Sequence, residues 1–369
     1  MIIRIERLAL KNIQNISDSE IFLKEYSNLC EGIVGEFSNT LAIFGPNGSG
    51  KTTVINTLKL IKNIIQGDKI KTNIIKSTCK TATSEIDFLV VDEDYLTSYL
   101  VKYNITFSSV SILEEDLHII QYDEFGESNV YYSDSSSDKE HVITEIFMER
   151  KNKIVDSIID YIKNNFKFID MSHSDVIIDF SFWNMGEEEL HLNNIITTNN
   201  DVNFIINRIN PALKLLTNRE LFVTRLEDTD DFVVRFKHND CVILFDRESL
   251  GIRKIVNLLL YLIPLMHKLD CCVCVDELDS SLFDNITAII LESTYSCIGG
   301  QVIFTSHQLS LLNTSILDSV FFAENNKYVT LAGKPLGSVY RKHVINTVSN
   351  FSNHSKIFNA MLEAGDLDE

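Results

Sequence analysis

A glycine-rich stretch at residues 44–53, FGPNGSGKTT, constrains the fold of this chain more than any other feature. It follows a short apolar segment, TLAIF, and precedes a run with helical periodicity, VINTLKLI. A G-x-x-x-x-G-K-T loop between a strand and a helix is a phosphate-binding loop (P-loop). The pattern predicts an α/β fold that binds a nucleoside triphosphate, and a chance glycine-rich turn is the alternative.

This loop contains the groups that a triphosphate and its Mg²⁺ require. Its glycines have no Cβ, so the backbone can bring successive N–H groups round an anion. Lys51 is placed to reach the β- and γ-phosphates, and the Thr52 hydroxyl to ligate Mg²⁺. The expected nucleotide-binding residues of the loop are Gly45, Asn47, Gly48, Gly50, Lys51, Thr52 and Thr53. The expected cofactors are therefore ATP and Mg²⁺.

A second stretch at residues 271–284, CCVCVDELDSSLFD, has the form of a Walker B element. An apolar strand ends in two acids, and these acids can serve different roles. Asp276 is expected to hold the Mg²⁺ shell, and Glu277 to orient and deprotonate the attacking water. The alternative is a surface strand end with two acids, which the P-loop earlier in the chain makes less favoured.

Two further segments have a polar residue where an apolar run begins or ends. QVIFTSHQLSLL is a buried-looking strand that ends at His307, although a lone histidine is usually a satisfied polar side chain. In RESLGIRKIVNLLLYLIPLMHKL, Ser249 is placed to cap a long apolar helix, and Gly251 lies in its first turn. Such a helix end can bind a phosphate, or it is only a capped core helix.

Taken in order, these motifs resemble a known class of ATPase. The set MIIRIERLALKNIQNIS, GPNGSGKTT, ESLGIRK, DELDSSL and FTSHQLSLL resembles the head-domain ATPases of the SMC, RecF and OLD class. It is most similar to small ATPases of bacterial phage-defence systems, such as the AbiL-type and PARIS-type ATPase subunits. The resemblance covers roughly the first hundred and the last hundred and thirty residues, and implies an ABC/SMC-head-like α/β fold with a mixed central sheet and a helical insertion lobe.

The resemblance also implies roles for the residues at matching positions. Lys51 and Thr52 would bind phosphate and Mg²⁺, Asp276 the Mg²⁺ shell, and His307 the γ-phosphate. Ser249 and Gly251 would contact the nucleotide held by a facing subunit, so that hydrolysis depends on dimerisation. ESLGIRK departs from the LSGGQ signature of transporters, which weakens a transporter reading. Gln121, in HIIQYDEFG, is the candidate for the glutamine loop.

Length and patterning predict three parts. Residues 1–110 are expected to form the N-terminal part of the ATPase head, and residues 111–240 an insertion lobe with helices and strands. Residues 241–369 are expected to complete the head with the signature, the Walker B acids and the switch histidine. The middle part has no apolar heptad sustained over three or four repeats, so any helical arm must be short.

Net charge and the lack of long apolar runs limit the binding partners and the cell compartment that we expect. A net charge of −19 argues against a broad nucleic-acid footprint, so nucleic acid is not favoured, and the lysines after the P-loop are read as a solvated helix face. The sequence has no uncharged apolar run of 18 residues, and its N-terminus reads as a strand rather than a signal peptide. A cytoplasmic protein without a membrane segment, and with reduced cysteines, is therefore expected.

Four functions remain open. The first is a nucleotide-gated sensor or switch for a separate effector, which could be a nuclease, in anti-phage defence. The others are a RecF-like DNA repair ATPase, a transporter subunit, and a scaffold with vestigial ATP binding. We favour the first, as a homodimer or higher homo-oligomer. The signature is unlike that of transporters, the acidic charge does not supply the basic surface that repair would need, and Lys51, Asp276 and Glu277 are intact, which conflicts with a vestigial scaffold. The segment after His307 is too short for a nuclease domain of ~100 residues, so the effector is expected to be another polypeptide.

Overall fold

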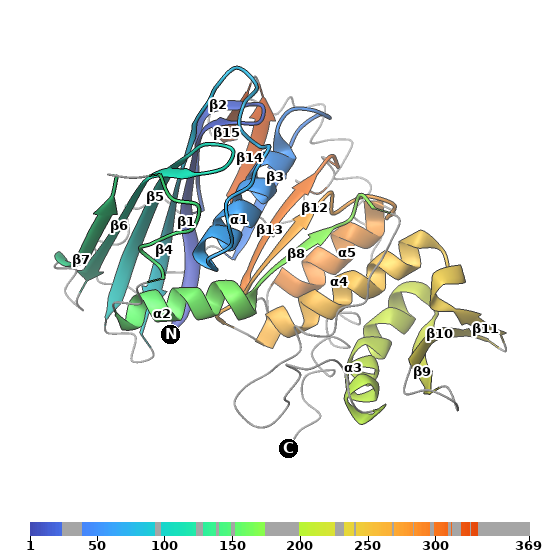
Figure 1. Cartoon of the computed structure of the whole chain (residues 1–369). Helices are drawn as coiled ribbons and strands as arrows, with labels where there is room; N and C mark the ends of the chain where they lie inside the picture. The colour runs from blue at the N-terminus through green and yellow to red at the C-terminus, as the bar shows by residue number, and fades with distance from the viewer. Residues whose placement is uncertain are drawn as a thin grey trace.

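The computed structural model contains, across the residues that it describes, two six-stranded sheets, a three-stranded sheet and helices between and beside them (Figure 1). The described residues are 1–23, 39–92, 97–122, 128–137, 140–148, 152–173, 199–225, 232–239, 241–267, 269–282, 284–295, 299–308, 311, 319–324 and 326–330. None of the helices in these ranges is long and apolar enough to span a membrane.

The first sheet is antiparallel and has the strand order β2-β1-β4-β5-β6-β7. Its strands are β1 (Ile2–Ile13), β2 (Ile16–Phe22), β4 (Ala82–Val91), β5 (Ser98–Phe107), β6 (Ile112–Tyr122) and β7 (Ser128–Ser136). Along β5 and β6, buried residues alternate with more exposed ones for most of each strand, as expected of strands that pack on one side. The N-terminal segment is thus a strand, as predicted.

The second sheet contains the predicted motifs. Its strands are β3 (Thr40–Phe44), β8 (Phe166–Asp170), β12 (Cys272–Asp276), β13 (Gln301–Ser306), β14 (Ser319–Glu324) and β15 (Lys327–Thr330). They lie in the order β15-β14-β3-β13-β12-β8, and all neighbours are parallel except β14 and β15. This is the mixed sheet of the predicted α/β fold, and the carboxyl ends of β3, β12 and β13 share one edge.

Helices cover both faces of this mixed sheet (Figure 1). The helices α1 (Lys51–Ile65) and α2 (Lys153–Asp160) share a core with the antiparallel sheet and one face of the mixed sheet. On the other face, α4 (Leu250–His267) and α5 (Asp284–Tyr295) pack against the alternate residues of the same strands. Burial on both faces explains why TLAIF, CVCV and QVIF are continuous apolar runs.

A smaller lobe precedes α4. It consists of α3 (Asn199–Thr217) and a three-stranded antiparallel sheet of β9 (Glu220–Arg225), β10 (Phe232–His238) and β11 (Cys241–Leu244). The predicted insertion began at residue 111, which falls between β5 and β6, two neighbouring strands of the antiparallel sheet. Of the strands within residues 111–240, β6 and β7 belong to the antiparallel sheet, β8 to the mixed sheet, and β9 and β10 to the three-stranded sheet. In the mixed sheet, β8 lies directly beside β12.

Candidate nucleotide-binding site

The P-loop lies between β3 and α1 and has the backbone that its glycines were predicted to allow. Gly50 is the N-cap of α1 with φ of 105°, and Gly48 has φ of 75°. Both values lie in the left-handed region that side chains rarely adopt. At Gly45 a Cβ would lie only 2.8 Å from the backbone oxygen of Ala323 on β14. The loop therefore needs glycine for its conformation and for its close packing.

Lys51 places its ammonium under this loop. The residue is 5% exposed, and Nζ donates to the carbonyl oxygens of Gly45 at 2.8 Å and Pro46 at 3.0 Å. Nζ also lies 3.2 Å from Nδ1 of His307, at the end of β13. Burial lowers the pKa of Lys51, against the opposing effect of nearby acids, of which Glu277 is the strongest. The predicted phosphate-binding lysine and switch histidine are thus in direct contact.

Thr52 and Asp276 converge as the sequence predicted for a metal site. The Thr52 hydroxyl donates to Oδ1 of Asp276 at 3.2 Å, across the sheet edge between α1 and β12. A hydroxyl and a carboxylate are oxygen ligands that Mg²⁺ accepts, with water and phosphate oxygens completing its shell. These two residues fit the ion. No group of three or more His, Cys, Asp or Glu suited to a metal occurs in the described ranges.

Thr305, which the sequence analysis did not single out, links the two Walker B acids. Its hydroxyl donates to Oδ1 of Asp276 at 2.5 Å and accepts from the backbone N–H of Glu277 at 2.8 Å. Glu277 has φ of 52°, a left-handed conformation that is uncommon outside glycine. Thr305 could have been found from its place two residues before His307, because neighbouring parallel strands end at the same edge.

Asp279 is a second contributor that the sequence analysis missed. Its carboxylate accepts from the backbone N–H of His307, at 3.1 Å to Oδ2 and 3.3 Å to Oδ1. It lies in the loop between β12 and α5. The loop after Glu277 is therefore tied to the turn that presents His307, the candidate switch histidine.

Ser249 and Gly251 lie at the start of α4, apart from this set of contacts. Ser249 is exposed, and its carbonyl accepts from the N–H of Arg253 at 3.1 Å, as in a first helical turn. A Cβ on Gly251 would lie 2.9 Å from the backbone oxygen of Ser281. The exposure of Ser249 leaves this helix end accessible to another molecule, and its role stays a prediction.

The other two predicted loop residues differ in exposure. Asn47 is exposed at the tip of the P-loop. Thr53 is 2% exposed, and its hydroxyl donates to Oε1 of Gln14 at 2.8 Å. The Thr53 side chain thus joins the loop to the first sheet.

The prediction for the glutamine loop was wrong. Gln121 lies on β6, opposite Tyr99 and Asn129 in the antiparallel sheet. The strand that borders Walker B is β8, whose last residue, Asp170, pairs with Asp276. Periodicity identified strands but not their neighbours, so it could not tell which strand end lies beside the acids.

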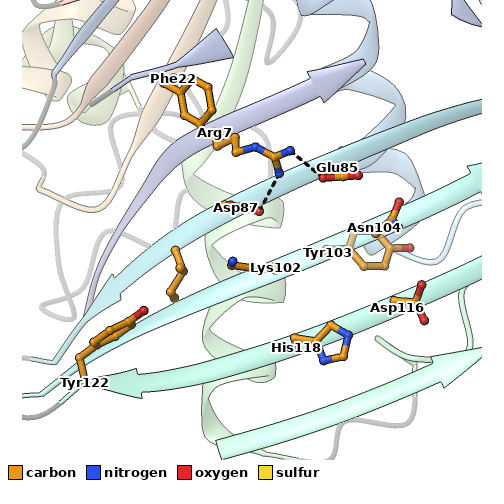
Figure 2. A pocket seen from close by; sticks show the side chains of 11 residues that line it. Arg7, Phe22, Glu85, Asp87, Lys102, Tyr103, Asn104, Asp116, His118 and Tyr122 are labelled. Carbon is orange, nitrogen blue, oxygen red and sulfur yellow. Dashed lines mark ion pairs between the residues drawn. The ribbon is translucent and has the colours of Figure 1, made fainter. Parts of the chain in front are cut away.

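A separate pocket of about 550 Å³ lies on the polar face of the antiparallel sheet (Figure 2). Charged side chains of both signs line it, among them Arg7, Glu85, Asp87 and Lys102. Arg7 is 2.8 Å from Glu85 Oε2 and 3.7 Å from Asp87 Oδ1. None of the predicted nucleotide-binding residues lines this pocket, so it is not the site of the proposed chemistry.

Among solved structures, SMC head domains are similar to this chain. The chain is similar to the SMC head domain from Thermotoga maritima, with 16% identity, a TM-score of 0.39, and coverage of 86% of this chain and 94% of that one. A second is an Smc head bound to the C-winged helix domain of ScpA, with 16% identity, a TM-score of 0.46, and coverage of 89% and 98%. A third is the Smc head with an extended coiled coil from Pyrococcus furiosus, with 12% identity, a TM-score of 0.44, and coverage of 94% and 99%.

The sequence itself matches one family. No curated protein matches the chain. Residues 41–313 match the family described as "AAA domain, putative AbiEii toxin, Type IV TA system". The matched region includes the P-loop, α4, Asp276, Glu277 and His307. The match confirms the predicted ATPase class. The likeness to AbiL-type or PARIS-type subunits stays a prediction. Because the match spans well over half of its residues, the chain belongs to this family of AAA domains.

Proposed function

We propose that this chain is a Mg²⁺-dependent ATPase that works as a head-to-head homodimer and switches a separate effector protein according to its nucleotide state. One observation carries the proposal. Lys51 lies 3.2 Å from His307, and Thr52 lies 3.2 Å from Asp276, at one edge of a sheet beside a P-loop. Ligands of open α/β sheets bind at the carboxyl ends of the strands.

Each group at this edge has a distinct task in the proposed reaction. Lys51 and the P-loop N–H groups would hold the phosphates of ATP, and Thr52 and Asp276 would hold Mg²⁺. When bound, the ion supplies positive charge that stabilises the phosphoryl oxygens. Glu277 would orient the attacking water and accept its proton.

The exposed start of α4 supports a dimeric site. A helix N-terminus presents unpaired N–H groups and a partial positive charge, so it attracts phosphate. Ser249 and Gly251 would offer this surface to the nucleotide of a second copy. A two-fold interface must be self-complementary, so each copy would give its α4 to the P-loop of the other.

The overall charge favours a protein as the output partner. Nonspecific affinity for DNA comes mainly from neutralising phosphates with Lys and Arg, and a net charge of −19 opposes it. We therefore place the toxic or nucleolytic activity of a bacterial anti-phage system in an effector that this chain holds or releases.

The chemistry is tested by the Glu277→Gln variant. It leaves the P-loop intact and removes the base, so nucleotide binding should persist while phosphate release stops. Glu114→Gln, an exposed acid on β6, is the matched control and should keep full turnover. Unchanged hydrolysis by Glu277→Gln would sink the assignment.

The dimeric arrangement is tested by mixing two inactive variants, Lys51→Ala and Ser249→Arg. A mixed dimer regains one complete site, because one copy supplies Lys51 and the other supplies Ser249. Recovered hydrolysis is the expected result. Continued inactivity in confirmed mixed dimers would contradict the arrangement.

The separate effector is tested with the purified chain, DNA, RNA and Mg²⁺. The chain alone should degrade neither nucleic acid. Metal-dependent degradation that disappears on mutating residues of this chain would overturn the proposal, and tight, salt-dependent DNA binding would favour the RecF-like alternative.

A further inference from the structure

Lys254, on the second turn of α4, buries its ammonium beneath the loop that follows Walker B. The residue is 1% exposed. Its Nζ donates to the carbonyl of Met171, to the carbonyl and hydroxyl of Ser280 at 3.3 and 3.4 Å, and to the hydroxyl of Ser281 at 3.3 Å. Burying an ammonium is costly unless acceptors surround it, so a lysine here needs these contacts.

Two acids at the edge of the proposed site act electrostatically on Lys254. Burial lowers the pKa of Lys254, while Glu277 and Asp170 oppose this effect. Asp170 is the last residue of β8, and Glu277 directly follows the neighbouring parallel strand β12. Its hydrogen bonds place the ammonium between α4 and the residues that follow these strands, Met171 after β8 and Ser280 and Ser281 after β12.

The loop that Lys254 holds is strained and functionally placed. Glu277 has φ of 52° and Ser281 has φ of 64°. Such conformations cost free energy in non-glycine residues and persist only where the surroundings fix them. Between these two residues, Asp279 accepts the N–H of His307. A displacement of this loop would thus move the proposed base and the turn that bears the switch histidine.

A second contact joins α4 to the same loop. A Cβ on Gly251 would lie 2.9 Å from the backbone oxygen of Ser281, so the first helical turn packs directly on the loop. With Lys254 bound to Ser280 and Ser281 from the next turn, the start of α4 and residues 277–281 are held together at two points.

We propose that Lys254 is a positioning residue that couples the start of α4 to Glu277 of its own chain. This inference rests on the proposed function. Lys254 and Gly251 tie the first turns of α4 to residues 280–281, so the position of this helix sets the position of the loop that follows Glu277. Each copy thereby holds its own Glu277 in the position that hydrolysis of its own ATP requires, whether or not the start of its α4 contacts a second nucleotide.

The first test compares Lys254→Met with Lys237→Met, an exposed lysine on β10. Lys254→Met keeps the length of the side chain and removes the ammonium. We expect its kcat to fall at least about tenfold and its nucleotide Kd to stay within about threefold, since the P-loop is intact. Lys237→Met should match the wild type. An unchanged kcat for Lys254→Met would overturn the inference.

The second test separates action within the chain from action across the interface. In a mixed dimer of Lys254→Met and Lys51→Ala, the only P-loop with Lys51 shares its chain with the Lys254→Met change. Its facing α4 has a normal Lys254. If Lys254 positions Glu277 of its own chain, hydrolysis does not recover. Recovery would show that Lys254 only supports the surface around Ser249, and would overturn the inference while the proposed function stands.

Two controls make these outcomes distinct. The Ser249→Arg and Lys51→Ala pair must recover in the same experiment, and its failure would count against the proposed function instead. If thermal unfolding shows that Lys254→Met does not fold, the double variant Ser280→Ala, Ser281→Ala removes two acceptors of the ammonium. It should lower kcat severalfold without changing the nucleotide Kd, and full kcat would overturn the inference.

Discussion

The Thr305 hydroxyl donates to Oδ1 of Asp276 at a distance of 2.5 Å. The same hydroxyl oxygen accepts the N–H of Glu277, so one buried side chain orients both Walker B acids. Thr52 donates to the same Oδ1 at 3.2 Å. One carboxylate oxygen of Asp276 is thus held by Thr305 on β13 and by Thr52 on α1. The orientation of Asp276 at the candidate metal site therefore depends on β13 as well as on its own strand.

Replacing Thr305 by valine should lower the rate of ATP hydrolysis more than it lowers the affinity for ATP. Valine has nearly the same shape but can neither donate to Asp276 nor accept from Glu277. Leaving a buried N–H without a partner costs roughly 1–3 kcal/mol of stability. We expect kcat to fall about tenfold or more while ATP affinity changes less, because Lys51 is untouched.

Phosphate-release kinetics and ATP titrations check this prediction, with unfolding in urea as the stability measurement. Thr106→Val is the matched control, because Thr106 lies on β5 with only a long hydroxyl contact to Thr83, at 3.4 Å. It should leave kcat unchanged. A Thr305→Val enzyme with normal kcat would show that the acids are oriented without this hydroxyl.

The sequence predicted the strands that lead into the candidate site. The P-loop, Asp276 and His307 each follow a short apolar run, and such runs mark buried parallel strands. The cysteines at 271, 272 and 274 are buried, as their apolar context indicated. These features depend on residues next to one another in the chain, which is why periodicity and spacing could reveal them.

Contacts between distant segments were not predictable in this way. Nothing in the order of strands showed that β8, rather than the segment with Gln121, borders Walker B. Lys254 lies in a helix whose sequence is largely apolar, so its pattern does not mark a polar site. Its acceptors come from residues 171 and 280–281, and only the fold brings them together.

Tyr328 should tune the P-loop from β15. Its hydroxyl donates to the carbonyl of Gly50, the N-cap of α1, at 2.7 Å, and the side chain is largely buried. Burial raises the pKa of this tyrosine, so it stays protonated and able to donate. Tyr328→Phe removes one hydrogen bond and should cost about 1 kcal/mol of stability.

Since the P-loop then loses one restraint, ATP affinity of Tyr328→Phe should also weaken, by roughly three- to tenfold. Calorimetric titration measures the affinity, and Tyr131→Phe, an exposed tyrosine on β7, serves as the control. An affinity equal to that of the wild type would restrict the role of Tyr328 to folding stability.

Arg7 should stabilise the antiparallel sheet through ion pairs with three acidic side chains of the same sheet. Its guanidinium lies 2.8 Å from Glu20 and Glu85 and 3.7 Å from Asp87, whose side chain is only 3% exposed. Removing the cation beside a buried carboxylate is costly, so Arg7→Met should lower the free energy of unfolding by about 3 kcal/mol. Glu20→Gln, at a side chain 46% exposed, should cost at most about 1 kcal/mol. Equal losses in urea unfolding would contradict this account.

Glu115 should make stability fall as the pH rises. It is fully buried on β6 and accepts from Thr144 Oγ1 at 2.6 Å, from Tyr103 Oη at 3.3 Å and from the N–H of Glu145 at 3.3 Å. Burial raises its pKa above the usual 4.5, although these hydrogen bonds oppose the shift. The folded state therefore retains a proton that the unfolded state has released. Its contribution to stability is full below the unfolded pKa and is lost as the pH rises through the folded pKa.

Glu115→Gln cannot titrate, so it isolates this contribution. The stability of the wild type relative to Glu115→Gln should decline as the pH rises from about 4 and should level off above the folded pKa. Urea unfolding across the acidic and neutral range measures the difference. Glu114→Gln, the exposed neighbour on the same strand, keeps Glu115 and should therefore decline in stability as the wild type does. A difference between wild type and Glu115→Gln that is the same at every pH would mean that Glu115 has equal proton affinity in the folded and unfolded chains, and burial on β6 would then carry no electrostatic cost.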